Sequence, residues 1–589
     1  MTDGIRHASR CCSLTLVKAD VRRSALFLQT VPLLLMALLA AGCSGDAVPS
    51  QATADLVLIN GKIVTMDPAM ESAEALSIRG DRIVAVGSTE EIRGQIGDRT
   101  EVLDLHGKLA IPGFIEGHGH FLALGRSLAE LDLTRNPTWA SVVEQVAEAV
   151  DTTPAGEWIL GRGWHQSKWE VAPEPSVAGL PYHDALSAVS ADNPVLLTHA
   201  SGHAVLANRR AMDLAGIGPS TPDPSGGEIV RDAEGRAIGV FRENAAGLIR
   251  GAGEVGWNEI AARHWVDLAT AESLRRGITS FQDAGSSVAT VELFKELARA
   301  GELGVRLWVM VRESNEVLAE SLGALRVVGL GNGFLTVRAI KQSIDGALGT
   351  HGAWLLDPYD DLPSSRGFST TSPKVLRETA RLAVEHDFQL CVHAIGDRGN
   401  RETLDIFEEA YATDSQRDWR WRIEHAQHLD HEDVGRFASL GVIASMQGVH
   451  CTSDGPWVPS RIGDRRSREG AYLWRDLIDS GAIVINGTDT PVEAVDPLAS
   501  YFASVTRELA DGQLFYPEQR MTREEALRSY TLDAAFAAFE ENEKGSLSVG
   551  KLADITVLSK DILTIASAEI LETEILYTLV GGSIRYRRE

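Results

Sequence analysis

Short apolar runs alternate with longer amphipathic segments through the middle of the chain. The apolar runs are clearest at residues 336–341, 389–393, 421–425 and 482–489, and amphipathic segments lie at 374–386, 398–412, 432–440 and 473–480. The apolar runs predict buried strands, and the amphipathic segments predict helices. Repeated strand–helix units are typical of a parallel sheet.

Polar residues gather just after each of these predicted strands. A (β/α)₈ barrel places its active site at that end of its strands. The sequence therefore predicts an α/β fold with a TIM-like (β/α)₈ barrel over residues 111–539. Residues 134–261 interrupt the alternation with proline-rich turns, several tryptophans and a hairpin at Gly226-Gly227. We expect this segment to be an insertion near the barrel mouth.

Both ends of the chain carry a β-strand pattern. The stretch "LVLINGKIVT" (56–65) predicts a hairpin with Asn60-Gly61 as a type I′ turn, and residues 75–87 repeat this pattern around Gly80-Asp81. Short strands are also predicted near the C-terminus, at 554–558 and on either side of Gly581-Gly582. We expect residues 55–110 and 540–589 to pair into one small composite β-sandwich domain.

The first 43 residues have the pattern of an export signal. Basic residues precede an apolar run, which ends in Leu39-Ala40-Ala41-Gly42-Cys43. The Gly-Cys ending resembles a bacterial lipoprotein signal with Cys43 as the lipidated N-terminus, and the small, polar residues 44–54 predict a flexible tether. We expect an exported protein held at the bacterial cell envelope by a lipid anchor, facing the periplasm or on the cell surface. An ordinary signal peptide and a short membrane anchor remain alternatives.

Net charge and cysteine content limit the classes of partner and the kind of stabilisation that the chain can have. The formal net charge of −26 argues against a nucleic-acid partner and against docking on anionic lipid by charge. Beyond Cys43 the chain has only Cys391 and Cys451, which make no disulfide framework. A small-molecule substrate is the expected partner, and a homodimer is compatible with the sequence.

The stretch "GFIEGHGHF" (113–121) holds two histidines, His118 and His120. On an extended strand, residues two apart point to the same face, so both imidazoles could reach one metal ion. Alone, the pair fits two polar residues in a glycine-rich turn equally well. Gly117 and Gly119 alternate with the histidines, which leaves room for close packing on the opposite face.

Lys341 ends the apolar run "LTVRAIK" and is expected to share a strand face with Val337 and Ala339. A lysine that points into a barrel interior is costly unless it is paired or chemically altered. A neutral buried amine can take up CO₂ to form a carbamate, which is a metal-bridging anion. The alternative is a lysine at the strand end with its ammonium group in water.

Three further polar residues end predicted strands. His393 and His425 each follow an apolar run, and Asp489 closes "AIVINGTD" on the same face as Ile485 and Gly487. Each histidine alone could be a hydrogen-bonded core residue, and Asp489 could cap a following helix. Together with the histidine pair, however, two histidines at successive strand ends are hard to explain by chance. They predict a metal site.

This set of groups, in this order along the barrel, resembles the amidohydrolase superfamily in its two-metal form. Five sequence motifs resemble those of the branch that contains N-substituted formamide deformylases: "GFIEGHGHF", "IKQSIDGALG", "VHAIGD", "RIEHAQ" and "NGTDTP". The resemblance runs from about Asp55 to the C-terminus. It is specific for the superfamily and much less so for the substrate.

The resemblance implies a role for each group. His118 and His120 would bind the deeper metal with Asp489, His393 and His425 would bind the second, and carboxylated Lys341 would bridge both. Histidine and carboxylate ligands suit Zn²⁺ best. Two close metals activate a bridging water, and Asp489 would act as general base and then as general acid.

Other residues give weaker signals. His203 in "SGHAVLAN" is a candidate substrate contact or a structural polar residue, and Trp164, Trp169 and Trp457 are candidates for an aromatic wall or simple packing. We expect His351, His428 and His450 to support the site or lie on the surface, and Asp345-Gly346 to form a turn.

Three functions follow from these patterns. The first is metal-dependent hydrolysis of a C–N bond in an amide or N-substituted formamide. The second is hydrolysis of a lactone, carbamate or cyclic imide by the same centre. The third is a non-catalytic binding lipoprotein on a hydrolase scaffold, which the intact set of six candidate ligands argues against.

Overall fold

The structure, a computed structural model, describes residues 53–589 except 225, 252–258 and 415. The predicted signal with Cys43, and the tether up to residue 52, lie outside the described residues. Within the described part of the chain, no helix is both long enough and apolar enough to cross a membrane.

Eight parallel strands form the central sheet. They are β8 (Phe114–Gly119), β17 (Ile278–Ser286), β18 (Arg306–Val311), β20 (Leu335–Ser343), β21 (Gln389–Ala394), β22 (Arg422–His425), β23 (Ile443–Gln447) and β24 (Val484–Gly487). The short strand β19 (Val327–Gly329) pairs antiparallel with β20. Just past the end of β24, the Asp489 amide donates a hydrogen bond to the His118 carbonyl at 2.7 Å, so the last strand meets the first. The predicted TIM-like barrel is confirmed, in nearly closed form.

Amphipathic helices connect these strands. They include α2 (Phe121–Ala129), α7 (Glu259–Arg275), α8 (Val288–Ala300), α9 (Asn315–Leu325), α11 (Pro373–Glu385), α12 (Asp397–Tyr411), α13 (His431–Leu440), α14 (Gly448–Asp454), α15 (Val458–Gly470), α16 (Trp474–Asp479), α17 (Pro497–Thr506) and α18 (Arg523–Ser529). Several begin at a side-chain cap: Ser287 caps α8, Ser372 caps α11 and Asp496 caps α17. Because Asp496 caps α17, Asp489 is left free for another role.

Apolar side chains pack at the amino ends of the barrel strands, beside the buried polar residues Gln282, Gln389 and Arg422. Ala534 and Ala537 of α19 (Leu532–Ala537) pack there with Ile115 and Ile485. Trp308 and Met310 of β18 pack with Ala339 and Cys391 in a neighbouring cluster. Polar side chains are therefore free to meet at the carboxyl ends, as the general pattern of this fold requires.

A β-bulge in β20 corrects one sequence expectation. Val337 pairs with Val309 of β18, but Ala339 pairs with Met310, so Arg338 is an extra residue. Val337 consequently packs in the outer core, whereas Ala339 packs inside the barrel with the face that carries Lys341. The expectation that Val337 shares this face is wrong.

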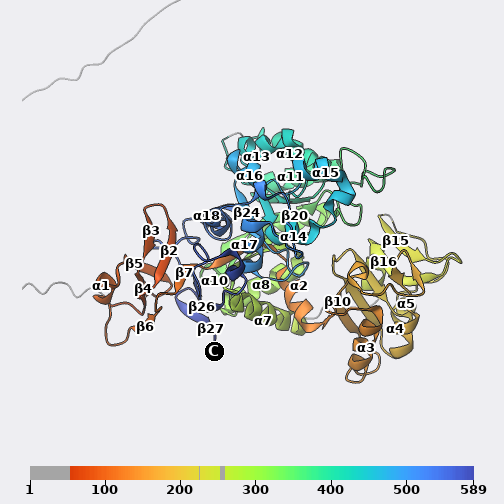
Figure 1. Ribbon diagram of the computed structural model, residues 1–589, viewed down its shortest axis with the longest axis horizontal. Helices are drawn as coiled ribbons and strands as arrows, with labels where there is room; N and C mark the ends of the chain where they lie inside the picture. Colours follow the sequence, from red (N-terminus) through yellow and green to blue (C-terminus); the bar gives the residue numbers. More distant parts are fainter. Residues whose placement is uncertain (1–52, 225, 252–258, 415) are drawn as a thin grey trace, which may run out of the picture. The chain divides into compact units, whose positions relative to one another are not determined.

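The two chain ends build two sheets. One sheet has the order β5-β4-β1-β6 and the other the order β27-β26-β25-β7-β2-β3. Strands β2 to β7, β26 and β27 of these sheets are labelled in Figure 1. Their strands are β1 (Leu56–Ile59), β2 (Lys62–Asp67), β3 (Met70–Ala73), β4 (Ala75–Arg79), β5 (Arg82–Gly87), β6 (Glu101–Asp104), β7 (Leu109–Pro112), β25 (Ile555–Leu558), β26 (Ile575–Val580) and β27 (Ser583–Arg587). Leu58 from one sheet and Val557 from the other belong to one buried cluster.

The predicted hairpin at Asn60-Gly61 is wrong. β1 pairs with β4 and β6, while β2 pairs with β3 and β7, so the two strands lie in different sheets. Asn60 does adopt a left-handed conformation (φ 53°), but here the chain crosses from one sheet to the other. The hairpins around Gly80-Asp81 and Gly581-Gly582 form as predicted.

The interrupting segment forms its own sheet, in the order β15-β16-β14-β13-β10-β9. Its strands are β9 (Leu131–Asp132), β10 (Ile159–Trp164), β13 (Val195–His199), β14 (Ala204–Ala207), β15 (Gly227–Arg231) and β16 (Ala237–Glu243), with helices α3 (Trp139–Val150), α4 (Asp184–Val189), α5 (Arg209–Leu214) and α6 (Ala246–Arg250). The β15–β16 turn lies at residues 232–236, so the expected hairpin at Gly226-Gly227 is wrong. Arg162 Nε donates to the Pro491 carbonyl at 3.2 Å, which ties this sheet to the loop after β24 at the barrel mouth.

Candidate metal centre

All six predicted ligands lie at the carboxyl ends of barrel strands. His118, Lys341, His393 and His425 belong to β8, β20, β21 and β22, whereas His120 and Asp489 follow β8 and β24 directly. Lys341 is only 2% exposed, which rules out the alternative of an ammonium group in water. Strands that lie far apart in the sequence thus deliver their polar ends to one place.

The first group joins β8 to β24. Asp489 Oδ1 lies 3.2 Å from His120 Nε2 and 3.5 Å from His118 Nε2. These three residues form one cluster with the spacing of a metal site. Lys341 Nζ lies 3.4 Å from His118 Nε2, so the lysine approaches the same group.

The second group continues from His118. The rings of His118 and His425 are 4.7 Å apart between centroids, and those of His425 and His393 are 4.6 Å apart. His393 Nε2 lies 3.7 Å from Asp345 Oδ1. The two histidine pairs and Asp489 therefore form a continuous row across the barrel mouth, with Lys341 beside it.

The glycines of "GHGH" permit this approach. A Cβ added to Gly117 would lie 2.3 Å from the Asn486 carbonyl oxygen, and one added to Gly119 would lie 2.6 Å from Phe281 Cζ. Real Cβ atoms are essentially never this close to other heavy atoms, so the tight contact between β8 and β24 depends on glycine at 117. The prediction that these glycines allow close packing is confirmed.

Hydrogen bonds fix the orientation of two histidine rings. His118 Nδ1 bonds to Glu424, and His425 Nδ1 bonds to Gln447 Oε1 at 2.7 Å. In each ring, Nε2 is left free for the centre, as is usual for metal-binding histidines. Although burial alone would raise the pKa of Glu424, Arg422 and His118 hold that pKa well below its usual value. Glu424 is thus a permanent carboxylate.

Replacing Glu424 by Gln is expected to weaken metal binding by about 10- to 100-fold, because loss of such a carboxylate loosens the histidine it orients. Chelator competition would measure the affinity. Glu409→Gln is the matched control, since Glu409 pairs with Arg377 at the surface of α12. Equal affinities for both variants would show that Glu424 does not orient a metal ligand.

Burial determines the protonation states of the side chains in this row. Desolvation lowers the pKa of His393 and of His425 far below the usual histidine value, so both rings are neutral at pH 7. It also lowers the pKa of Lys341 to about 8. Burial would raise the pKa of Asp489, but the adjacent His118 and His120 rings hold it well below its usual value. Neutral imidazoles and an ionised carboxylate are the forms that bind metals.

These donors fit divalent cations. Among the described residues, His393 Nε2, His450 Nε2 and Asp489 Oδ1 are buried without a hydrogen-bond partner. Burying such atoms unpaired is costly, so several at one place call for an explanation. Histidine nitrogens with carboxylate oxygens suit Zn²⁺ and related divalent ions. The row therefore meets the requirements of a metal-binding site.

His450 was expected to be a supporting or surface residue, but it faces the centre. Its Nε2 lies 3.8 Å from Asp489 Oδ2, and its Nδ1 accepts from Gln427 Nε2 at 3.0 Å. His425, His450 and Asp489 form a second cluster with metal-site spacing. The sequence signal for His450 was its position near the end of a barrel strand, because it comes three residues after β23.

Asp345 also does more than form a turn. Its carboxylate accepts hydrogen bonds from the amides of Ile395, Gly396 and Trp354 at 2.8–3.0 Å. Burial nevertheless raises the pKa of Asp345 to about 7. The carboxylate thereby holds the loop after His393 in place.

The weaker candidates lie in different places. His203 is half-buried and bonds to Glu243 Oε2 at 2.9 Å, and the preceding Gly202 lies beside the Arg162 guanidinium, which reaches the loop after β24. Trp457 is half-buried against the outer core and close to Gly349 in the loop after β20. Trp164 is buried in the core of the insertion and donates Nε1–H to the Leu197 carbonyl. The expectation of Trp164 in an aromatic wall is therefore corrected.

Known proteins resemble the chain over most of its length. Residues 101–586 match the family described as "Amidohydrolase family". Protein LONG AFTER FAR-RED 3 of Arabidopsis thaliana is 32% identical over 555 residues, covering 91% of this chain and 92% of that protein. N-substituted formamide deformylase of Arthrobacter pascens is 30% identical over 546 residues, covering 91% and 98%. An uncharacterized metal-dependent hydrolase from Pyrococcus horikoshii superposes with a TM-score of 0.72 at 26% identity, covering 87% and 99%.

Proposed function

The chain belongs to the amidohydrolase family and is a metal-dependent hydrolase, and from this premise we propose that it hydrolyses a carbon–nitrogen bond in an amide or N-substituted formamide. The name of the deformylase relative supports this choice. Lactones, carbamates and cyclic imides are the alternative substrates of the same centre.

Asp489 gives the main physical support. Amines are poor leaving groups, so cleavage of a C–N bond needs a residue that protonates the departing nitrogen. Asp489 has one oxygen against His120 and the other toward His450, at the open end of the barrel. This position supports the proposal that the carboxylate takes a proton from the attacking water and returns it to the leaving nitrogen.

The proposal assigns two divalent cations, with Zn²⁺ the best match to the donors. His118, His120 and Asp489 would hold one, and His393 and His425 the other. Bound there, they would lower the pKa of a water molecule and polarise the substrate carbonyl. His118, Lys341 and His425 are buried, which strengthens the electrostatic contacts of these groups. His450, whose Nε2 lies 3.8 Å from Asp489 Oδ2, would face the reacting groups from the other side.

Lys341 is proposed to be carboxylated and to bridge the cations. Its lowered pKa, about 8, leaves a usable fraction of neutral amine near neutral pH. The neutral Nζ would add to the carbon of CO₂, forming an N–C bond and a carbamate oxyanion while the nitrogen releases one proton. The anion would also remove the cost of burying a cationic amine beside metal ions.

A panel of acyl compounds tests the proposed reaction. It would contain N-formyl-2-phenylethylamine, N-acetyl-2-phenylethylamine, a phenyl-substituted lactone and the matching carbamate. Each compound would be incubated with purified zinc-loaded protein, and the release of its product would be measured. We expect amine release from the formamide or the acetamide. Hydrolysis of the lactone alone would contradict C–N cleavage and leave the family assignment intact.

A further inference from the structure

Arg312 stands at the barrel mouth directly after β18. Its amide donates to the Ser286 carbonyl at 2.9 Å, and its side chain passes over Gly285. A Cβ added to Gly285 would lie 3.0 Å from Arg312 Cδ and 3.6 Å from Lys341 Cγ, so both side chains meet above this glycine. The Arg312 guanidinium bonds to Ser343, and Ser343 is paired with His393 in the β20–β21 register. Arg312 therefore lies beside the candidate metal ligands.

Within the described chain, the Arg312 guanidinium forms no ion pair with a carboxylate. Its one hydrogen bond joins Nη2 to Ser343 Oγ at 3.3 Å. The neighbouring Glu313 is turned away, because its Oε1 accepts from the Val288 amide at 2.9 Å. The acidic group that acts electrostatically on Arg312 is Asp489, whose charge the centre itself uses.

A second arginine approaches from the insertion. Arg162 Nη2 donates to the Ala200 carbonyl, and Nε donates to the Pro491 carbonyl two residues beyond Asp489. It too forms no ion pair among the described residues, since the nearby Glu130 is engaged by Arg126. Neither arginine forms an ion pair with a carboxylate among the described residues, so both add positive charge to the mouth.

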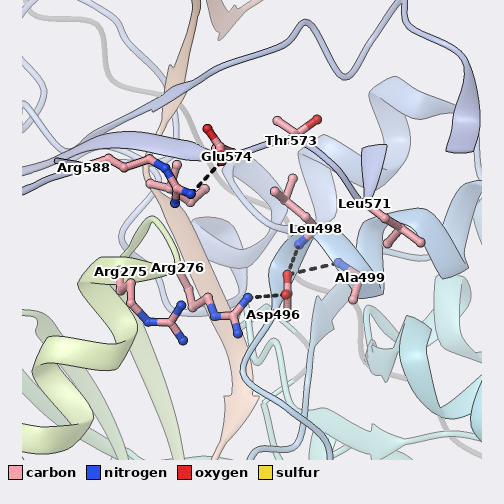
Figure 2. Close-up of a pocket in the computed structure, with 10 residues that line it drawn as sticks. Arg275, Arg276, Asp496, Leu498, Ala499, Leu571, Thr573, Glu574 and Arg588 are labelled. Carbon is pink, nitrogen blue, oxygen red and sulfur yellow. Dashed lines mark hydrogen bonds and ion pairs between the residues drawn. The ribbon is translucent and has the colours of Figure 1, made fainter. Parts of the chain in front are cut away.

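Three arginines around a separate cavity are each paired with a carboxylate. A cavity of about 130 Å³ is lined by Arg275, Arg276 and Arg588, and none of the six predicted ligands lines it. Figure 2 shows Arg276 paired with Asp496 and Arg588 paired with Glu574, at 2.6 Å for the latter. Arg275 pairs with Glu272. Each guanidinium of this cavity therefore already has its anion.

We propose that the substrate carries an anionic group, such as a carboxylate, and that Arg312 binds it while Arg162 adds to the positive potential. This inference rests on the proposed function and names its substrate class: N-acyl or N-formyl compounds with a carboxylate near the scissile amide. Guanidinium groups suit carboxylates because they donate two parallel hydrogen bonds. A chain of net charge −26 would otherwise disfavour anions, so local positive charge at the mouth is needed to admit them.

Two formamides that differ in one carboxylate test the proposal: N-formylphenylalanine and N-formyl-2-phenylethylamine. The readouts are kcat/KM and calorimetric affinity for each compound with wild-type protein, Arg312→Gln and the matched control Arg588→Gln. We expect wild type to favour the carboxylate compound. Arg312→Gln should reduce the ratio of the two kcat/KM values by about 10- to 100-fold, the scale of a lost charge-assisted hydrogen-bond pair. Arg588→Gln should leave this ratio unchanged.

The outcomes separate the two claims. An unchanged ratio in Arg312→Gln, with both compounds hydrolysed, would overturn the anion site and leave C–N hydrolysis standing. If neither compound nor the N-acetyl analogue is hydrolysed but N-formylphenylalanine binds wild type and not Arg312→Gln, the anion site stands and the proposed reaction fails. Binding of N-formylphenylalanine that is equally strong in both proteins would place its carboxylate elsewhere and overturn the site.

Discussion

Asp489→Asn is expected to lower kcat by at least about a thousandfold, since the amide cannot take a proton from water and return it to the leaving nitrogen. Asn has nearly the same shape, and it tolerates the left-handed backbone conformation of this position (φ 56°) better than most residues. The thermal unfolding temperature should therefore change little. Steady-state kinetics and a melting curve would measure both effects.

The control for this substitution is Asp511→Asn, an aspartate in an exposed turn, where its side chain caps the Gln513 amide. It makes the same chemical change away from the centre and should leave kcat unchanged. A near-normal kcat in Asp489→Asn would exclude Asp489 as the proton carrier, even if metal binding were intact.

Lys341→Ala is expected to lower bound metal from about two equivalents per chain to about one or fewer, and to lower kcat/KM by at least about a thousandfold, because two-metal catalysis needs its bridging ligand. Metal analysis after dialysis, followed by kinetics, would measure these losses. Added acetate or propionate should restore part of both, since a small carboxylate can occupy the space left by the carbamate.

Lys295→Ala separates loss of the bridge from loss of a buried lysine. Lys295 is 3% exposed and donates to Glu292 and to the Ala324 carbonyl on the outer layer of the barrel. Its replacement should lower stability and leave metal content normal. If Lys341→Ala also keeps its full metal content, Lys341 is not the bridge.

The barrel and the strands that carry the candidate ligands could be predicted from the sequence because each signal was local. His393 and His425 follow apolar runs directly, and parallel strands in this fold bring their carboxyl ends together. Period-two alternation failed at Val337, since a one-residue bulge reverses which face a side chain takes. The hairpin predicted at Asn60-Gly61 failed because a local turn signal does not determine strand pairing. The two flanking strands belong to different sheets, and the packing of those sheets decides which strands pair.

The supporting residues could not be predicted in the same way. Glu424 precedes His425 by one residue but bonds to His118, which is 306 positions away in sequence. His450 depends on the path of the chain after β23, where the backbone turns into α14 instead of continuing the strand. Arg312 stands out only because, in the part of the chain that the structure describes, its guanidinium forms no ion pair with a carboxylate. Such contacts follow from tertiary structure and leave no periodic signal.

Titrating metal-free protein with Zn²⁺ while following amine release from N-formyl-2-phenylethylamine or its acetamide tests the central claim most directly. Turnover should be absent without metal, rise with added Zn²⁺ and level off at about two equivalents per chain. Full turnover by the metal-free protein would contradict a metal-dependent centre. Two bound equivalents with no amine released from either compound or from N-formylphenylalanine would contradict hydrolysis of a carbon–nitrogen bond.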